Sequence, residues 1–139
     1  MIFSIFGAYI SAVCYAILLH VQKKHIFICG IVGAIGSFIN LIITQKGYSP
    51  VLATFCGSIV VTQLSYFLAR RRKTPVTVFL ISGIIPLVPG IWLYRTMYYL
   101  LFQEFNTALS YFILTFEIAG VIAGSIILVT LFPRLWRKT

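Results

Sequence analysis

The sequence predicts an all-α membrane protein with five transmembrane helices, the fourth of which is broken at Pro86–Gly90. Of its 139 residues, 60% are hydrophobic and 9% are charged, which is more apolar surface than a soluble domain needs. The apolar residues form runs that can cross a hydrocarbon core about 30 Å thick. Short basic clusters separate several of these runs, as in membrane proteins. We therefore treat residues 1–139 as a single polytopic membrane domain.

The first two spans are predicted over residues 2–21 and 26–44, with a basic cluster between them. In the second span Gly33, Gly36, Ser37 and Asn40 follow helical spacing and form one stripe. Small residues permit close helix contact, and an amide in the membrane needs a partner on another helix. The glycines are therefore expected to pack internally, whereas Asn40 serves either packing or a polar site.

The other three spans are predicted over residues 51–69, 75–103 and 107–132. Gln63 in the third span is costly in lipid and is expected to point inward. The fourth run would extend about 43 Å as one helix, which exceeds the hydrocarbon core, so a break would absorb part of the excess. Pro133 is expected to end the fifth span.

The basic residues predict the orientation of the chain. With five alternating spans, nine of the 11 Lys and Arg residues fall on one side of the membrane: Lys23, Lys24, Arg70, Arg71, Arg72, Lys73, Arg134, Arg137 and Lys138. Lys46 and Glu104 fall on the other side. The positive-inside rule makes the first side cytoplasmic, with the N-terminus outside and the C-terminus inside.

The break in the fourth span is the first candidate site. Pro86 and Pro89 each remove a backbone donor, and Gly90 tolerates unusual backbone angles. Broken helices at mid-membrane build the substrate sites of many transporters, although a proline kink can also serve packing alone. Tyr94 and Arg95 follow the break. Arg95 is expected to bind a carboxylate, to pair with Glu117, or to extend toward the interface.

Glu117 is the only acid within a predicted span. A carboxylate at that depth costs several kcal/mol unless it is paired, protonated or hydrated, so it is expected to point into protein. Such a group suits proton coupling or recognition of an ammonium, or it bonds a neighbouring helix as a structural acid. Gly120 and Gly124 share its face and form a GxxxG pattern for close helix packing.

No enzyme site is predicted. The sequence has no Asp, so it lacks an aspartyl dyad and a Ser-His-Asp triad. It also lacks metal-ligand spacing and a phosphate-binding loop, so neither a metal nor a cofactor is expected. His20 is expected at the membrane interface, and His25 is expected in a solvated loop. The three cysteines lie in apolar spans and are interpreted as packing residues.

The chain resembles the smaller, C-terminal-type membrane component of the threonine/serine exporter (ThrE) family. The strongest match runs from Lys73 to Gly90, KTPVTVFLISGIIPLVPG, and is followed by Tyr94. Weaker matches are Cys29-Gly30 with GAIG at residues 33–36, VLATF at residues 51–55, and Glu117 before Ala119-Gly120. Ser82, Ile91-Trp92 and Arg95 depart from the residues expected in many relatives.

The resemblance implies a multi-pass exporter in the bacterial inner membrane, for small amino acids or, in some members, dicarboxylates such as succinate. It also implies a two-part transporter, in which the partner is a larger membrane subunit with a soluble N-terminal domain. Independently, five spans and one acid are few for a complete transporter. A partner or further copies of the chain are therefore expected.

Two hypotheses follow for function. The first is a subunit of a secondary exporter, proton-coupled, with the break and Glu117 near the path. The alternative is a non-transporting subunit that stabilises a larger membrane partner. A channel is disfavoured because the polar residues form no continuous ring or stripe.

The orientation can be tested by cysteine accessibility in whole cells. A membrane-impermeant reagent should label Tyr48→Cys from outside and should not label Arg72→Cys, because the basic cluster is predicted to be cytoplasmic. Labelling of Arg72→Cys but not Tyr48→Cys would reverse the predicted topology.

Overall fold

The fold is known from a computed structural model that describes residues 1–136, and the side chains of residues 1–132. Every regular element in this part of the chain is helical. The elements are α1 (Ile2–Leu18), α2 (Lys23–Gln45), α3 (Pro50–Arg72), α4 (Val76–Ile84), the 3-10 helix η1 (Ile85–Leu87), α5 (Gly90–Leu101) and α6 (Phe105–Trp136). Arg137 and Lys138, which belong to the expected basic C-terminal end, lie outside the described residues.

Three helices, α2, α3 and α6, are long and apolar enough to cross a membrane. The pair formed by Val76–Leu87 and Gly90–Leu101 meets the same criterion as one bent span. The predicted all-helical fold and the broken fourth segment are therefore confirmed. α1 has 17 residues and is a shorter apolar helix, so a fifth span through it stays a prediction.

The break bends the chain by 44° but does not reverse it. Pro86 lies in η1, and the backbone then leaves the helix at Val88 (ψ 135°) and Pro89 (ψ 51°). Gly90 begins α5 and has no positive φ, so it does not supply the unusual backbone angle that its position predicts. The two prolines are sufficient, because each lacks an amide hydrogen for the helical ladder.

Residues in the left-handed region lie in the connections before and after α2, between α3 and α4, and between α5 and α6. They are His20 (φ 55°), Gly47 (φ 84°), Lys73 (φ 52°) and Gln103 (φ 61°). The angle of Gly47 is one that glycine adopts without strain.

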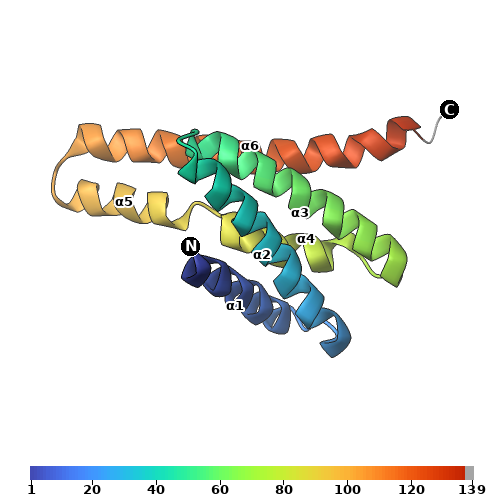
Figure 1. The fold of residues 1–139 in the computed structure, drawn as a ribbon. Helices are drawn as coiled ribbons and strands as arrows, with labels where there is room; N and C mark the ends of the chain where they lie inside the picture. Colours follow the sequence, from blue (N-terminus) through green and yellow to red (C-terminus); the bar gives the residue numbers. More distant parts are fainter. Residues whose placement is uncertain (137–139) are drawn as a thin grey trace.

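Helices α1 to α4 form a bundle, and α5 with the first part of α6 extends from it as a helical hairpin (Figure 1). α5 packs against α6 and against no other helix in the described part of the chain. α6 then continues along α3, so it joins the hairpin to the bundle.

Close contacts between backbones hold the bundle together. A Cβ atom added to Gly33 would lie 2.7 Å from the Cβ of Ala12, and one added to Gly83 would lie 2.8 Å from Val32 and Val61. One added to Gly57 would lie 2.9 Å from the carbonyl oxygen of Gly36. The α2 glycines therefore lie where neighbouring helices approach most closely.

Two predictions about individual residues are wrong. His25 lies inside α2 with only 2% of its surface exposed, and its ring meets the Phe79 ring edge-on at 5.6 Å. It is buried because α2 begins at Lys23, three residues earlier than the predicted span. Helix α6 continues past Pro133 to Trp136, since a proline near a helix end removes only one hydrogen bond.

The packing predicts how glycine substitutions change stability. Gly57→Ala should destabilise the detergent-extracted protein by about 1–3 kcal/mol, because its methyl group meets a backbone carbonyl that cannot rotate away. Thermal unfolding followed by circular dichroism would measure the change. Gly120→Ala is the control, since nothing lies within 4 Å of its added Cβ and alanine favours a helix. Equal midpoints for both variants would contradict this packing.

Candidate functional site

A cavity of about 540 Å³ lies beside the break, between α1, α2, α3 and the η1 region. This volume is within the range of small-molecule sites. Its polar lining consists of hydroxyl and amide side chains: Ser4, Ser11, Ser37, Asn40, Thr44 and Thr54. None of the described residues that line it carries a charge. The cavity can therefore bind a ligand through neutral donors and acceptors.

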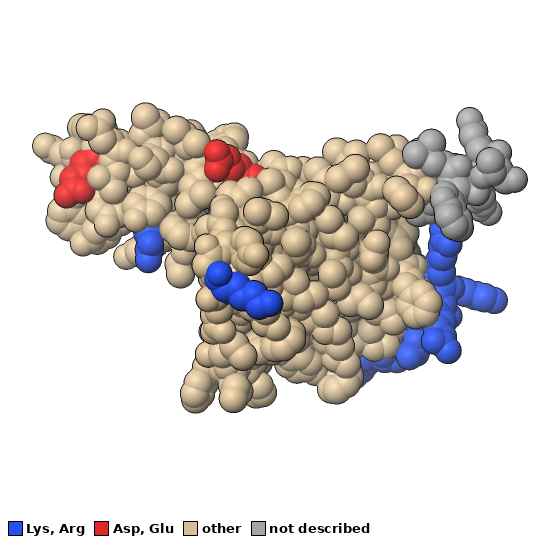
Figure 2. Space-filling view, turned by 45° about the horizontal axis from the view of Figure 1, so that its top comes forward, with Lys and Arg blue, Asp and Glu red and all other residues tan. Residues whose placement is uncertain are grey.

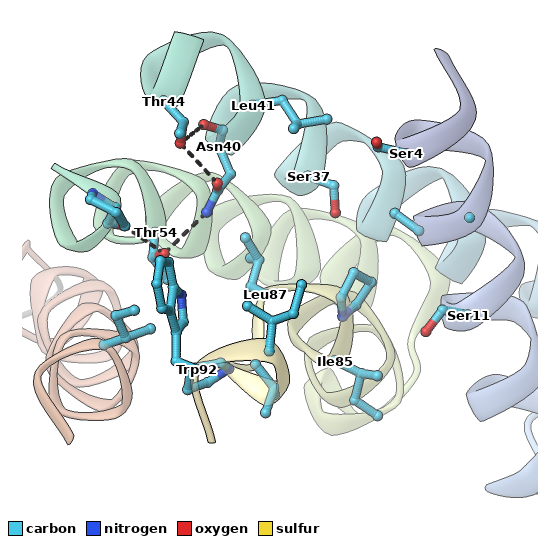
Figure 3. Close-up of a pocket in the computed structure, with 18 residues that line it drawn as sticks. Ser4, Ser11, Ser37, Asn40, Leu41, Thr44, Thr54, Ile85, Leu87 and Trp92 are labelled. Atoms are coloured by element: carbon cyan, nitrogen blue, oxygen red, sulfur yellow. Dashed lines mark hydrogen bonds between the residues drawn. The ribbon is translucent and has the colours of Figure 1, made fainter. Parts of the chain in front are cut away.

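Asn40 joins two walls of the cavity. Its Nδ2 donates a hydrogen bond to Thr54 Oγ1 at 3.1 Å, which links α2 to α3 (Figure 3). The Thr54 hydroxyl donates in turn to the carbonyl oxygen of Pro50 at 2.8 Å. Thr44 Oγ1 donates to the backbone carbonyl of Asn40, also at 2.8 Å. This network fixes the amide and leaves its second N–H free for a ligand.

Ser37 has an unused hydrogen-bonding group. Its side chain points into the cavity (Figure 3), only 9% of its surface is exposed, and its buried Oγ has no partner. Among the described side chains, His25 Nδ1 is the other such atom. A buried hydroxyl without a partner costs about 1–3 kcal/mol, so a rotation of the Ser37 side chain that exposes its Oγ to a polar ligand in the cavity would recover that free energy.

The break supplies the opposite wall. Pro86, Leu87, Val88 and Pro89 all line the cavity, and Trp92 extends from the first turn of α5 toward Thr54 (Figure 3). The predicted site residues Pro86, Pro89 and Asn40 are thus brought together. Irregular backbone is tolerated at membrane depth where protein or a polar cavity covers it, and here both do.

Tyr94 and Arg95 lie outside the cavity. Tyr94 is 67% exposed on α5. Arg95 is exposed, and its guanidinium lies 5.3 Å from the Trp92 ring centre and 5.7 Å from that of Tyr111. The aromatic rings of Trp92 and Tyr111 stack at 5.9 Å, so the cation is held on an aromatic surface beside the cavity. Arg95 and Glu117 are both exposed, and the roles of Arg95 in binding a carboxylate or in reaching the interface stay predictions.

Glu117 does not line the cavity, although the next residue, Ile118, does. Its side chain is exposed on the outer face of α6. Nothing lies within 4 Å of a Cβ added to Gly120 or Gly124, so no helix of this chain covers that face. The expectation that Glu117 points into protein is not met within the chain itself. We call Glu117, Gly120 and Gly124 the open face of α6.

Gln63 is exposed as well. It lines a groove between α3 and α6 and does not line the cavity at the break. The inward orientation predicted for it is wrong, because Thr62 and Ser65 occupy the buried side of α3 and bond to their own helix backbone. A polar residue in a span was a sound signal of a site, but it did not identify which side of the helix is covered.

The sequence did not single out several residues that build the cavity. Ser37 was predicted only as part of the α2 stripe. No role was predicted for the other lining residues Ser4, Ser11, Thr44, Thr54 and Trp92. The sequence signal that could have identified these residues is the number of hydroxyl groups near the ends of the first three apolar segments.

An all-helical protein with spans of this length and a polar cavity at a broken helix has the architecture of a membrane transporter. A family model described as threonine/serine exporter, ThrE, matches residues 4–132. The chain belongs to the threonine/serine exporter family, which is a family of exporters and not of enzymes. The resemblance found in the sequence is thereby confirmed.

Two curated relatives are similar over most of this chain. An uncharacterized protein of Haemophilus influenzae is 28% identical over 97 residues, which are 70% of this chain and 33% of that protein. A probable threonine/serine exporter of Mycobacterium tuberculosis is 26% identical over 92 residues, which are 66% of this chain and 17% of that protein. The chain thus matches a third or less of either relative. No solved structure shows significant similarity.

Proposed function

We propose that this chain is a subunit of a secondary exporter of small amino acids of the threonine and serine type, in a bacterial inner membrane. The observation that carries the proposal is the cavity beside the break, with the unpartnered Ser37 hydroxyl aimed into it. The family to which the chain belongs, and the name of the Mycobacterium tuberculosis relative, support the amino-acid class.

The chemistry of the lining favours an amino acid over a dicarboxylate such as succinate. A dianion in a low-dielectric cavity needs cationic partners, and none of the described lining residues is charged. Of the cations close to lining residues along the chain, Lys46 is exposed and Arg95 is stacked on Trp92 and Tyr111. A substrate with no net charge and a hydroxyl side chain matches Ser37, Asn40 and Thr54 better.

The position of the cavity fits release on the outer side. Its polar residues come from the start of α1, the end of α2 and the start of α3. With five spans and an external N-terminus, as the basic clusters predict, these three helix ends lie in the outer half of the membrane. An export path would then pass the break on the way out.

A second polypeptide is needed to complete the transporter. A carboxyl group exposed to lipid is expensive, and the open face of α6 leaves Glu117 uncovered. The glycines beside it allow a foreign helix to approach closely. Because each curated relative is at least three times as long as the part matched, we propose a larger subunit of the same family, or a further copy of this chain, as the partner.

The cavity predicts which variants lose export. The variants are expressed in native cells from which only this chain has been deleted. Ser37→Ala should reduce threonine efflux about fivefold, because one hydrogen bond of about 1 kcal/mol to the substrate is removed. Efflux from cells loaded with a threonine dipeptide would measure the change. Ser110→Ala is the matched control, since Ser110 is exposed and bonds only to its own helix at Asn106.

A different result would favour the alternative role. If Ser37→Ala, and also Asn40→Leu, export threonine at the wild-type rate and expression level, the chain is better described as a non-transporting subunit that stabilises its partner. Efflux of succinate in preference to threonine by the wild type would reject the amino-acid proposal.

Proton coupling is proposed for Glu117, and Glu117→Gln tests it. The variant keeps the size and hydrogen-bonding capacity of the side chain but cannot ionise. It should assemble normally, lose uphill export and retain exchange of substrate down its gradient. Uphill export at the wild-type rate would reduce Glu117 to a packing residue. Gly120→Leu is compared with Glu117→Gln. It should prevent a partner helix from binding to the open face of α6, while the thermal unfolding of the chain stays unchanged.

A further inference from the structure

A second cavity, of about 500 Å³, lies between α3 and α6 and shares no residue with the cavity at the break. Its α3 wall is formed by Gln63, Tyr66, Phe67 and Arg70, which follow one another at helical spacing. These four residues therefore form one stripe, with an amide at one end and a guanidinium at the other. The distance between those ends along the helix axis is about 10 Å.

The α6 wall is apolar and consists of Leu128, Val129 and Phe132. The hydroxyl groups of Tyr66 and Thr130 form a hydrogen bond of 3.0 Å between the two helices. α3 and α6 run in the same direction (Figure 1), and the apolar wall faces the stripe across the groove. The groove is thus apolar along its sides and cationic at one end.

That end of the molecule is strongly basic. Arg70 and Arg71 are exposed in the last turn of α3, and Figure 2 shows Lys and Arg side chains gathered at one end of this face. The two acidic residues of the chain, Glu104 and Glu117, lie away from this end (Figure 2). The guanidinium at the mouth of the groove is therefore available for an anion.

We propose that the groove between α3 and α6 binds one anionic phospholipid, with its phosphate on Arg70 and an acyl chain along Phe67, Leu128 and Phe132. Arginine binds phosphate through two parallel hydrogen bonds, and basic pockets between transmembrane helices bind anionic head groups. Gln63 lies deeper along the same stripe, where its amide donates to a glycerol-ester carbonyl. This site is independent of substrate export.

The composition of the walls favours a lipid over a helix from a second copy. Close packing of membrane helices uses small residues, whereas the groove is lined by Tyr66, Phe67 and Phe132. A second copy approaching by the same end would also bring its own arginines against Arg70, and like charges repel. An acyl chain is flexible and neutral, so it fits between aromatic rings without either cost.

Native mass spectrometry of the purified chain would test the proposal. The protein is equilibrated with equal amounts of phosphatidylglycerol and phosphatidylcholine that carry identical acyl chains. The wild type should retain one phosphatidylglycerol in preference to phosphatidylcholine. Arg70→Gln should reduce that preference about fivefold, which is the factor contributed by one basic residue near an anionic bilayer surface.

Arg71→Gln is the matched control, because it removes the same charge from a neighbouring residue that does not line the groove. Val129→Trp should fill the groove and reduce binding of both lipids. Equal losses from Arg70→Gln and Arg71→Gln would show a general surface charge and overturn the site. Displacement of the lipid by millimolar inorganic phosphate would show that the groove binds an anion and is not specific for a lipid. A dimer that retains no lipid would assign the groove to a second copy of the chain.

Discussion

The break in the fourth span depends on space that three glycines provide. A Cβ added to Gly33 would lie 3.4 Å from Pro86, and one added to Gly36 or Gly57 would lie 3.4 or 3.2 Å from Leu87. The side chains of Pro86 and Leu87 in η1 therefore pack against the glycine backbones of α2 and α3. Without that cover, the unpaired carbonyl groups around the two prolines would face lipid, which provides no donors.

The same packing places the polar cavity. η1 packs against α2 and α3 through Leu87. Val88 and Pro89 follow η1 and therefore line the same cavity as Asn40 and Thr54. α1 closes the side through its small residues, with Ala8, Ala12 and Ala16 buried. A hydroxyl such as that of Ser37 can stay buried without a partner because the surrounding bundle is stabilised by these close contacts.

Sequence patterns predicted the helices well and the covered faces poorly. Apolar length and the two prolines were enough for the spans and for the break, since both are local properties of the chain. Gln63 and Glu117 were expected to point inward, yet both are exposed. Their orientation depends on which neighbouring helix packs where, and a helix that is apolar all round gives no periodic signal of its buried side. Asn40 was assigned better, because the glycines on its stripe marked the packed face.

Most buried hydroxyl groups of α3 bond to carbonyl groups of their own helix, as Ser58, Thr62 and Ser65 do. The described side-chain hydrogen bonds that connect α3 to its neighbours are those of Asn40 with Thr54 and of Tyr66 with Thr130. A helix whose polar groups are satisfied internally can slide or rotate as a rigid rod while nearly all of its hydrogen bonds persist. The energy barrier to such a shift is then set by these two interhelical hydrogen bonds and by the fit of side chains against glycine backbones.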